Sequence, residues 1–147
     1  ACVHRADATA KINAITYRRL QVRLEAAGTN LGAIEDFITS CGENCPRDLK
    51  SKASELAEFV RRSESELSQA SYSRYALGKF LGKCGLKCPQ NLIDEARLRV
   101  KILEDEAREY HEAAGQVSRL IYYVVNCRAC EHRADARHDI EVLKAGA

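Results

Sequence analysis

Seven cysteines are the residues of this chain best suited to covalent or metal chemistry, and their spacing is regular. Six of them form three doublets, meaning two cysteines separated by two or three residues: CGENC at 41–45, CGLKC at 84–88 and CRAC at 127–130. The first cysteines of these doublets lie 43 residues apart, and Cys2 lies 43 residues before Cys45. A fixed period of this size indicates a chain built from repeated supersecondary units.

The elements that must position these cysteines are long helices. In the third repeat, apolar residues recur at alternating spacings of three and four, which predicts one packed helical face. These residues are Ala96, Val100, Leu103, Ala107, Tyr110, Ala114, Val117, Ile121 and Val124. Each doublet marks a helix end, because a glycine such as Gly42 or Gly85 stops a helix and a proline such as Pro46 or Pro89 fits the first turn of the next. We expect helices at about 4–40, 46–82, 89–126 and 131–145, with a kink or short break at 28–32.

These helices predict an all-α fold, namely an elongated antiparallel bundle of three long helices and a short C-terminal helix. Short connections make neighbouring helices antiparallel. We expect one domain, 1–147, with internal repeats at about 1–44, 45–87 and 88–129 and a partial fourth at 130–147. The two ends of the chain match as well, because ACVHRADA at 1–8 resembles ACEHRADA at 129–136.

An up-and-down arrangement of these helices brings Cys41, Cys45, Cys127 and Cys130 to one end and Cys2, Cys84 and Cys88 to the other. We therefore predict disulfides that staple both ends, since a bridge that closes a long loop stabilises a slender bundle. The expected pairs are Cys41–Cys130, Cys45–Cys127 and Cys2–Cys84, which leave Cys88 as a free or interchain thiol. The rival scheme pairs Cys41 with Cys127, Cys45 with Cys130 and Cys2 with Cys88, and it leaves Cys84.

Zinc is the alternative chemistry for the four-cysteine end. Cys41, Cys45, Cys127 and Cys130 would supply four thiolates, and His132 could replace one of them. The other end has only three cysteines although it shows the same doublets, so we favour disulfides and expect neither a metal nor a cofactor.

Composition narrows the cellular setting. The formal net charge is only +2, from 23 basic and 21 acidic residues, which gives no electrostatic case for nucleic acid or an anionic membrane. The apolar run at 120–125 is too short to span a bilayer. The chain begins at Ala1 and contains no methionine, so we read it as a mature product whose leader was removed. With seven cysteines, this predicts secretion to an extracellular, oxidising compartment.

Other reactive side chains are better explained by structure than by chemistry. Five tyrosines in the second and third repeats could line a ligand pocket, but at helical spacing they are typical of core and rim positions: Tyr72, Tyr75, Tyr110, Tyr122 and Tyr123. The acidic stretch at 104–109 alternates with basic residues, which predicts a solvated helix face. No nucleophile-elbow, P-loop or zinc-protease motif occurs.

The sequence therefore predicts a non-enzymatic, disulfide-stapled helical protein that acts in assembly or recognition. Its expected partner is a protein, including a second copy in a disulfide-linked dimer. The alternative is a carrier of an apolar ligand or pigment in the bundle interior, because many seam residues are alanines: Ala53, Ala57, Ala70, Ala107, Ala113 and Ala114.

Overall fold

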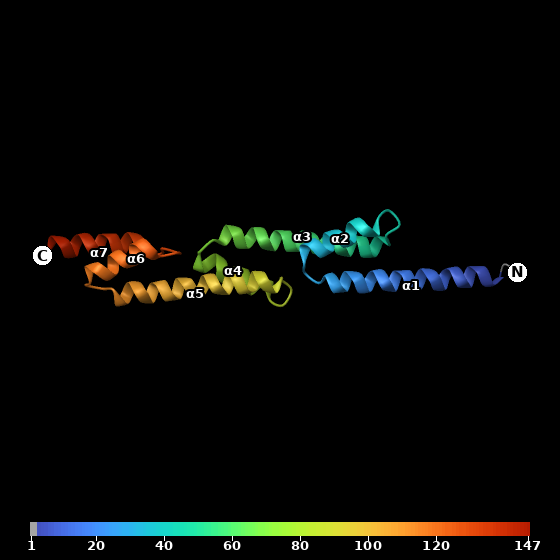
Figure 1. The fold of residues 1–147 in the computed structure, drawn as a ribbon, viewed down its shortest axis with the longest axis horizontal. Helices are drawn as coiled ribbons and strands as arrows, with labels where there is room; N and C mark the ends of the chain where they lie inside the picture. Colours follow the sequence, from blue (N-terminus) through green and yellow to red (C-terminus); the bar gives the residue numbers. More distant parts are fainter. Residues whose placement is uncertain (1–2) are drawn as a thin grey trace. The chain divides into compact units, whose positions relative to one another are not determined.

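A computed structural model describes residues 3–147, and over this range the chain forms seven α-helices and no strand (Figure 1). The all-α class is confirmed, but the three long helices and one short helix are wrong, because each expected long helix is divided in two. The helices are α1 (Val3–Ala27), α2 (Leu31–Cys41), α3 (Arg47–Ala70), α4 (Arg74–Cys84), α5 (Gln90–Glu112), α6 (Val117–Asn126) and α7 (Arg133–Ala145).

The break between α1 and α2 lies where the sequence predicted it. Gly28 has a φ of 55°, a left-handed conformation that ends a helix and favours glycine. Asn30 then caps α2, because its side-chain oxygen accepts a hydrogen bond from the backbone N–H of Ala33 at 2.9 Å. A glycine followed by a capping asparagine is a strong local signal, which is why the sequence sufficed here.

The other two breaks were not predicted. Ser71 has a φ of 48° without being glycine, and Ser73 caps α4 by accepting a hydrogen bond from the backbone N–H of Ala76 at 3.2 Å. Gly115, with a φ of 76°, separates α5 from α6. Serine occurs inside helices as well as at caps, so the residues at 71–73 did not predict a helix break.

The break after α5 also changes which residues are buried. Carried across it, the apolar pattern of the third repeat placed Ile121 on the packed face. Ile121 is 42% exposed, whereas Leu120 and Tyr123 are fully buried. The turn at 113–116 interrupts the period of the predicted seam, so on α6 Ile121 is exposed while Val124 of the same seam still packs against the buried cluster.

The chain divides into two compact units, Ala1–Ser65 and Glu66–Ala147, and the boundary falls within α3. In the first unit, α2 folds back along the second half of α1, and the start of α3 packs on the same core (Figure 1). Its buried side chains come from all three helices: Leu24, Ile34, Phe37, Cys45, Leu49, Ala53, Ala57 and Val60.

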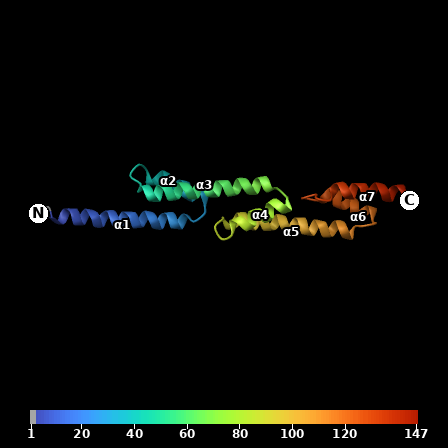
Figure 2. The same ribbon diagram turned by 180° about the vertical axis from the view of Figure 1, so that it is seen from behind.

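In the second unit, α4 packs on α5, and α6 packs on both α5 and α7. α6 and α7 lie side by side in both views (Figure 1 and Figure 2). Arg99 of α5 satisfies the last carbonyls of α3, since its Nη1 donates to the oxygens of Leu67 at 2.9 Å and Ser71 at 3.2 Å. This contact holds the end of α3 where the left-handed Ser71 stops the helix.

Candidate functional site: the disulfide hairpins and the exposed apolar surface

The cysteines pair within doublets, not between them. The disulfides are Cys41–Cys45, Cys84–Cys88 and Cys127–Cys130, with Cα–Cα distances of 5.0, 5.0 and 5.1 Å. The predicted pairs Cys41–Cys130 and Cys45–Cys127 are therefore wrong. The pairs Cys41–Cys127 and Cys45–Cys130 of the rival scheme are wrong for the same reason. Cys88 is bonded to Cys84 and is not a free thiol. Cys2 lies outside the described residues, but its predicted partner Cys84 is already bonded.

The helix breaks explain why the predicted pairing failed. It assumed unbroken helices that carry successive doublets to opposite ends of one bundle. In the structure each doublet is itself a tight hairpin, between a short helix and the next long helix in the first two cases and between α6 and α7 in the third. Two cysteines four residues apart across such a turn meet the Cα spacing that a disulfide needs.

The first two hairpins are closed by glycine. Gly42 and Gly85 follow the first cysteine with φ values of 67° and 51°, so each chain direction reverses in a conformation that glycine adopts without strain. The N–H of Cys45 donates to the oxygen of Gly42 at 3.4 Å, and the N–H of Gly85 donates to the oxygen of Leu81 at 3.4 Å. These turns depend on local backbone contacts.

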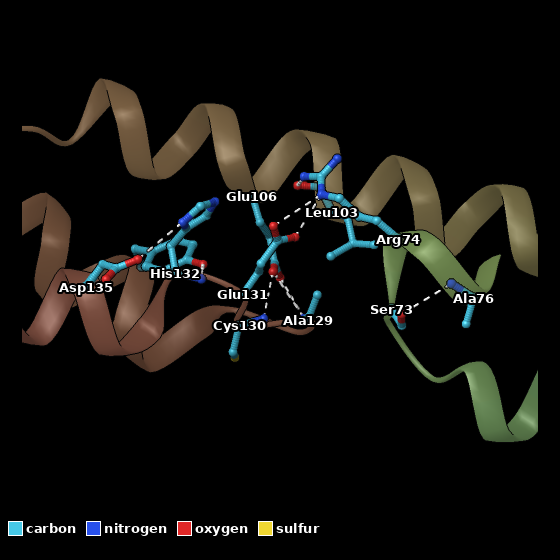
Figure 3. Close-up of polar contacts among 11 residues, drawn as sticks. Ser73, Arg74, Ala76, Leu103, Glu106, Ala129, Cys130, Glu131, His132 and Asp135 are labelled. Carbon is cyan, nitrogen blue, oxygen red and sulfur yellow. Dashed lines mark hydrogen bonds and ion pairs between the residues drawn. The ribbon is translucent and has the colours of Figure 1, made fainter. Parts of the chain in front are cut away.

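The third hairpin has no glycine and is held by a distant carboxylate. Cys130 takes a left-handed φ of 58°. The carboxylate of Glu106, on α5, accepts hydrogen bonds from three consecutive N–H groups, those of Arg128, Ala129 and Cys130, and Figure 3 shows the contacts with Ala129 and Cys130. The Ala129 bonds measure 3.1 Å to each oxygen, and the Cys130 bond measures 3.0 Å. The carboxylate thus occupies a nest of backbone donors.

Glu106 corrects the interpretation of 104–109 as a solvated face. Glu106 is only 7% exposed, whereas its neighbours Glu104, Asp105 and Glu109 are exposed. A buried carboxylate is stable where it is fully hydrogen-bonded. Nothing in the local charge pattern could distinguish Glu106, because its donors lie more than 20 residues further along the chain.

An ion pair lies beside this hairpin. Arg74, the first residue of α4, donates from Nε to both carboxylate oxygens of Glu131 at 2.9 and 3.2 Å and from Nη2 to the oxygen of Leu103 at 3.1 Å (Figure 3). The pair connects the start of α4 to the segment before α7. Because both side chains are more than a third exposed, its contribution to stability is small.

The hairpin leads into a cluster of aromatic rings. His132, which precedes α7, stacks on Tyr110 with ring centroids 4.8 Å apart and an angle of 6° between the rings. Its backbone N–H donates to the hydroxyl oxygen of Tyr123 at 3.2 Å, and its Nδ1 lies 3.6 Å from Asp135 (Figure 3). His111 is exposed, and its ring lies 5.8 Å from that of His132. His132 is thus part of the packing that places α7.

Two tyrosine–aspartate hydrogen bonds shift proton affinities. Tyr110 donates to Asp139 at 2.7 Å, and this bond together with desolvation raises the pKa of Tyr110 to about 12. Tyr17 donates to Asp48 in the first unit, which raises the pKa of Tyr17 and lowers the pKa of Asp48. Burial raises the pKa of Tyr123, which is fully enclosed. All three tyrosines are therefore neutral at physiological pH, and Tyr17 and Tyr110 act as hydrogen-bond donors.

The zinc alternative does not fit these residues. Cys41, Cys45, Cys127 and Cys130 are all in disulfides, so none supplies a thiolate. Across residues 3–147, no three His, Cys, Asp or Glu side chains gather in a metal-binding arrangement. No helix in this part of the chain is long and apolar enough to cross a membrane.

Large apolar side chains stand exposed on several helices. On α6, Ile121, Tyr122 and Val125 are 42, 61 and 71% exposed, and their spacing places them together on one face of that helix, which we call the outer α6 face. Tyr75 of α4 is 78% exposed, so the tyrosines that were predicted at core and rim positions range from the buried Tyr123 to the exposed Tyr75 and Tyr122. Tyr122 also lines a shallow groove with Glu109, Ser118 and Arg119.

Comparisons of the chain with protein-family models, with curated proteins and with solved structures found no match.

Proposed function

We propose that the chain is a non-enzymatic, secreted scaffold protein that acts in assembly or recognition. The observation that carries this proposal is the outer α6 face, where Ile121, Tyr122 and Val125 leave apolar surface beside a charged groove. Exposed apolar patches rimmed by polar residues mark protein-binding surfaces, and tyrosine is enriched among the residues that contribute most to binding. Three local disulfides in the described chain agree with an oxidising, extracellular setting.

The recurring order of long helix, short helix and disulfide hairpin supports the same proposal. The capping residues Asn30 and Ser73 lie 43 residues apart, and α3 and α5 begin 43 residues apart. We infer that the chain consists of 43-residue repeats, and repeats of this kind generally present extended binding surfaces. Coiled-coil packing of the repeats and self-association remain part of this proposal.

The seam alanines support a scaffold over a carrier. Ala53 and Ala57 are at most 1% exposed and sit among packed side chains of the first unit. Small residues at helix contacts let backbones approach closely, which leaves less interior volume for a ligand. A carrier would instead need these alanines to line a space.

Native mass spectrometry of the oxidised chain, together with size-exclusion chromatography and light scattering, tests the proposal. We expect a protein complex of defined stoichiometry with no non-protein mass. Val125→Asp, on the outer α6 face, should weaken that complex about tenfold or more. Val142→Asp is the matched control, since Val142 is 55% exposed on α7. A bound non-protein mass, or complexes insensitive to Val125→Asp, would contradict the proposal.

A further inference from the structure

The first half of α1 is a helix without a packing partner. Every residue from His4 to Thr16 is exposed, including Ile12 at 62% and Ile15 at 54%. Isolated helices of this length are marginal in water. The first halves of α3 and α5 differ, because each buries three apolar side chains: Leu49, Ala53 and Ala57 in α3, and Leu92, Ile93 and Ala96 in α5.

The sequence of this unpartnered half resembles that of α7 and the residue before it. The residues HRADA occur at 4–8 and again at 132–136, each preceded two residues earlier by a cysteine. Beyond this identity, Ile12 and Ile15 stand at the same spacing as Ile140 and Leu143. The two segments therefore present the same apolar positions on one helical face.

In α7, that face is a packing surface. Ala136 is fully buried beside Leu120 and Tyr123, and Ile140 and Leu143 pack against the same cluster. His132 stacks on Tyr110 just before the helix begins. The α5–α6 hairpin, meaning residues 90–126, is thus a receptor for a helix with this pattern, and its geometry is defined by α7.

We propose that the first half of α1 in one copy docks on the α5–α6 hairpin of a second copy, in the position that this second copy's own α7 otherwise occupies. Ala8, Ile12 and Ile15 take the places of Ala136, Ile140 and Leu143, and His4 takes the place of His132 on Tyr110. The inference rests on the proposed function and gives it a partner, namely a second copy of this chain joined head to tail.

The chain's own α7 is the stronger occupant. It is tethered to α6 by a short connection, which gives it an effective concentration on the order of millimolar. It also carries Glu131 for Arg74 and Asp139 for Tyr110, where α1 has Val3 and Lys11. The α1 helix of one copy therefore replaces α7 of another copy when α7 is released, or when the protein concentration approaches the effective concentration of the tethered α7.

Releasing α7 in the full-length, oxidised chain tests the proposal. Ala136→Glu places a carboxylate at a fully buried position of the α6–α7 contact, so α7 detaches. Hydrogen exchange should show residues 133–145 unprotected while the amides of α5 remain protected. Light scattering should then show head-to-tail oligomers at a concentration at least about tenfold lower than for the wild-type chain.

Adding Ile12→Asp and Ile15→Asp to the Ala136→Glu chain should restore the monomer. Val22→Asp is the matched control, because Val22 is 55% exposed on α1 but lies beyond the segment that resembles α7, and it should leave the oligomers intact. If circular dichroism shows that Ala136→Glu unfolds α5 and α6, Ile140→Asp at a partly buried position releases α7 more gently.

Two results would overturn the helix exchange. One is a chain that stays monomeric although α7 is unprotected, and the other is an oligomer that persists with aspartate at positions 12 and 15. Both results are independent of the outer α6 face. A complex that depends on Val125 would therefore still support the proposed function even if this inference fails.

Discussion

The hairpins Cys41–Cys45 and Cys127–Cys130 make the same reversal by different physical means. The first uses Gly42 at a φ of 67° and needs only its own backbone. The second uses a left-handed Cys130 and three N–H groups that are bound by the carboxylate of Glu106 on another helix. A turn without glycine can thus be stabilised by a tertiary contact, and its stability then depends on that contact.

The largest expected effect comes from removing that contact. Glu106→Ala leaves three partly buried N–H groups without an acceptor, so the free energy of unfolding of the second unit should fall by about 3 kcal/mol. Urea unfolding followed by far-ultraviolet circular dichroism measures this loss. Glu109→Ala is the matched control on the same helix, since Glu109 is exposed, and it should change stability by less than about 0.5 kcal/mol. Equal effects from both variants would mean that the carboxylate does not hold the hairpin.

The next effect concerns the disulfides themselves. Each closes a loop of only a few residues, so loop-closure entropy gives about 2 kcal/mol per bridge, compared with almost 5 kcal/mol for a loop of about 100 residues. We expect Cys41→Ser with Cys45→Ser to cost about 2 kcal/mol in urea unfolding of the first unit. The pair Cys127→Ser with Cys130→Ser should cost less, because Glu106 still holds that turn. A larger loss at the third hairpin would reverse the comparison.

A smaller effect is expected at Tyr110, beside the third hairpin. Tyr110→Phe removes the hydrogen bond to Asp139 and should cost about 1 kcal/mol near neutral pH. The folded pKa of Tyr110 is raised to about 12 from its usual value of 10.0, so the contribution of this hydrogen bond to stability is fully present below pH 10 and is lost as the pH rises through 12. The stability difference between wild type and Tyr110→Phe should therefore shrink across this window in pH-dependent urea titrations. A difference that stays constant from pH 9 to about 12 would argue against the bond.

The smallest effect tests the glycine-based hairpin. Gly42→Ala puts a β-carbon on a residue with a φ of 67° and a ψ of −159°, a combination that is essentially confined to glycine, so it should cost about 1 kcal/mol although the space around it is open. Gly78→Ala makes the same chemical change inside α4, where alanine favours the helix, and should stabilise by about 0.5–1 kcal/mol. Changes in the melting temperature of opposite sign for the two variants would confirm that the conformation at position 42 needs glycine. An unchanged melting temperature for Gly42→Ala would contradict it.

The sequence predicted those parts of the fold that depend on local chemistry. Glycines after the first cysteines, prolines after the second and the Gly28–Asn30 break all act over a few residues, and the structure places helix ends there. The break at Ser71 escaped prediction because its left-handed residue is stabilised by tertiary contacts, including Arg99 from α5. The two missed breaks, at 71–73 and 113–116, changed the lengths of the helices.

The pairing of cysteines failed for the same reason. Which cysteines meet depends on where helices end, so an error in helix length became an error in connectivity. Glu106 was missed because its three donors come from another part of the chain, and the surrounding Glu and Arg residues look alike in sequence. Local patterns identified the hairpins as sites, while the contacts that distinguish them are long-range.

Every described disulfide joins cysteines only three or four positions apart, so none of them links distant segments of the chain covalently. A protease that cuts in the turn at 71–73 would release two pieces that no disulfide among the described residues holds together, with or without reductant. Each bridge can also form as soon as its own turn emerges during synthesis, before the rest of the chain exists. These disulfides therefore stabilise individual turns. The segments of the chain are held together by the continuous backbone and by packing.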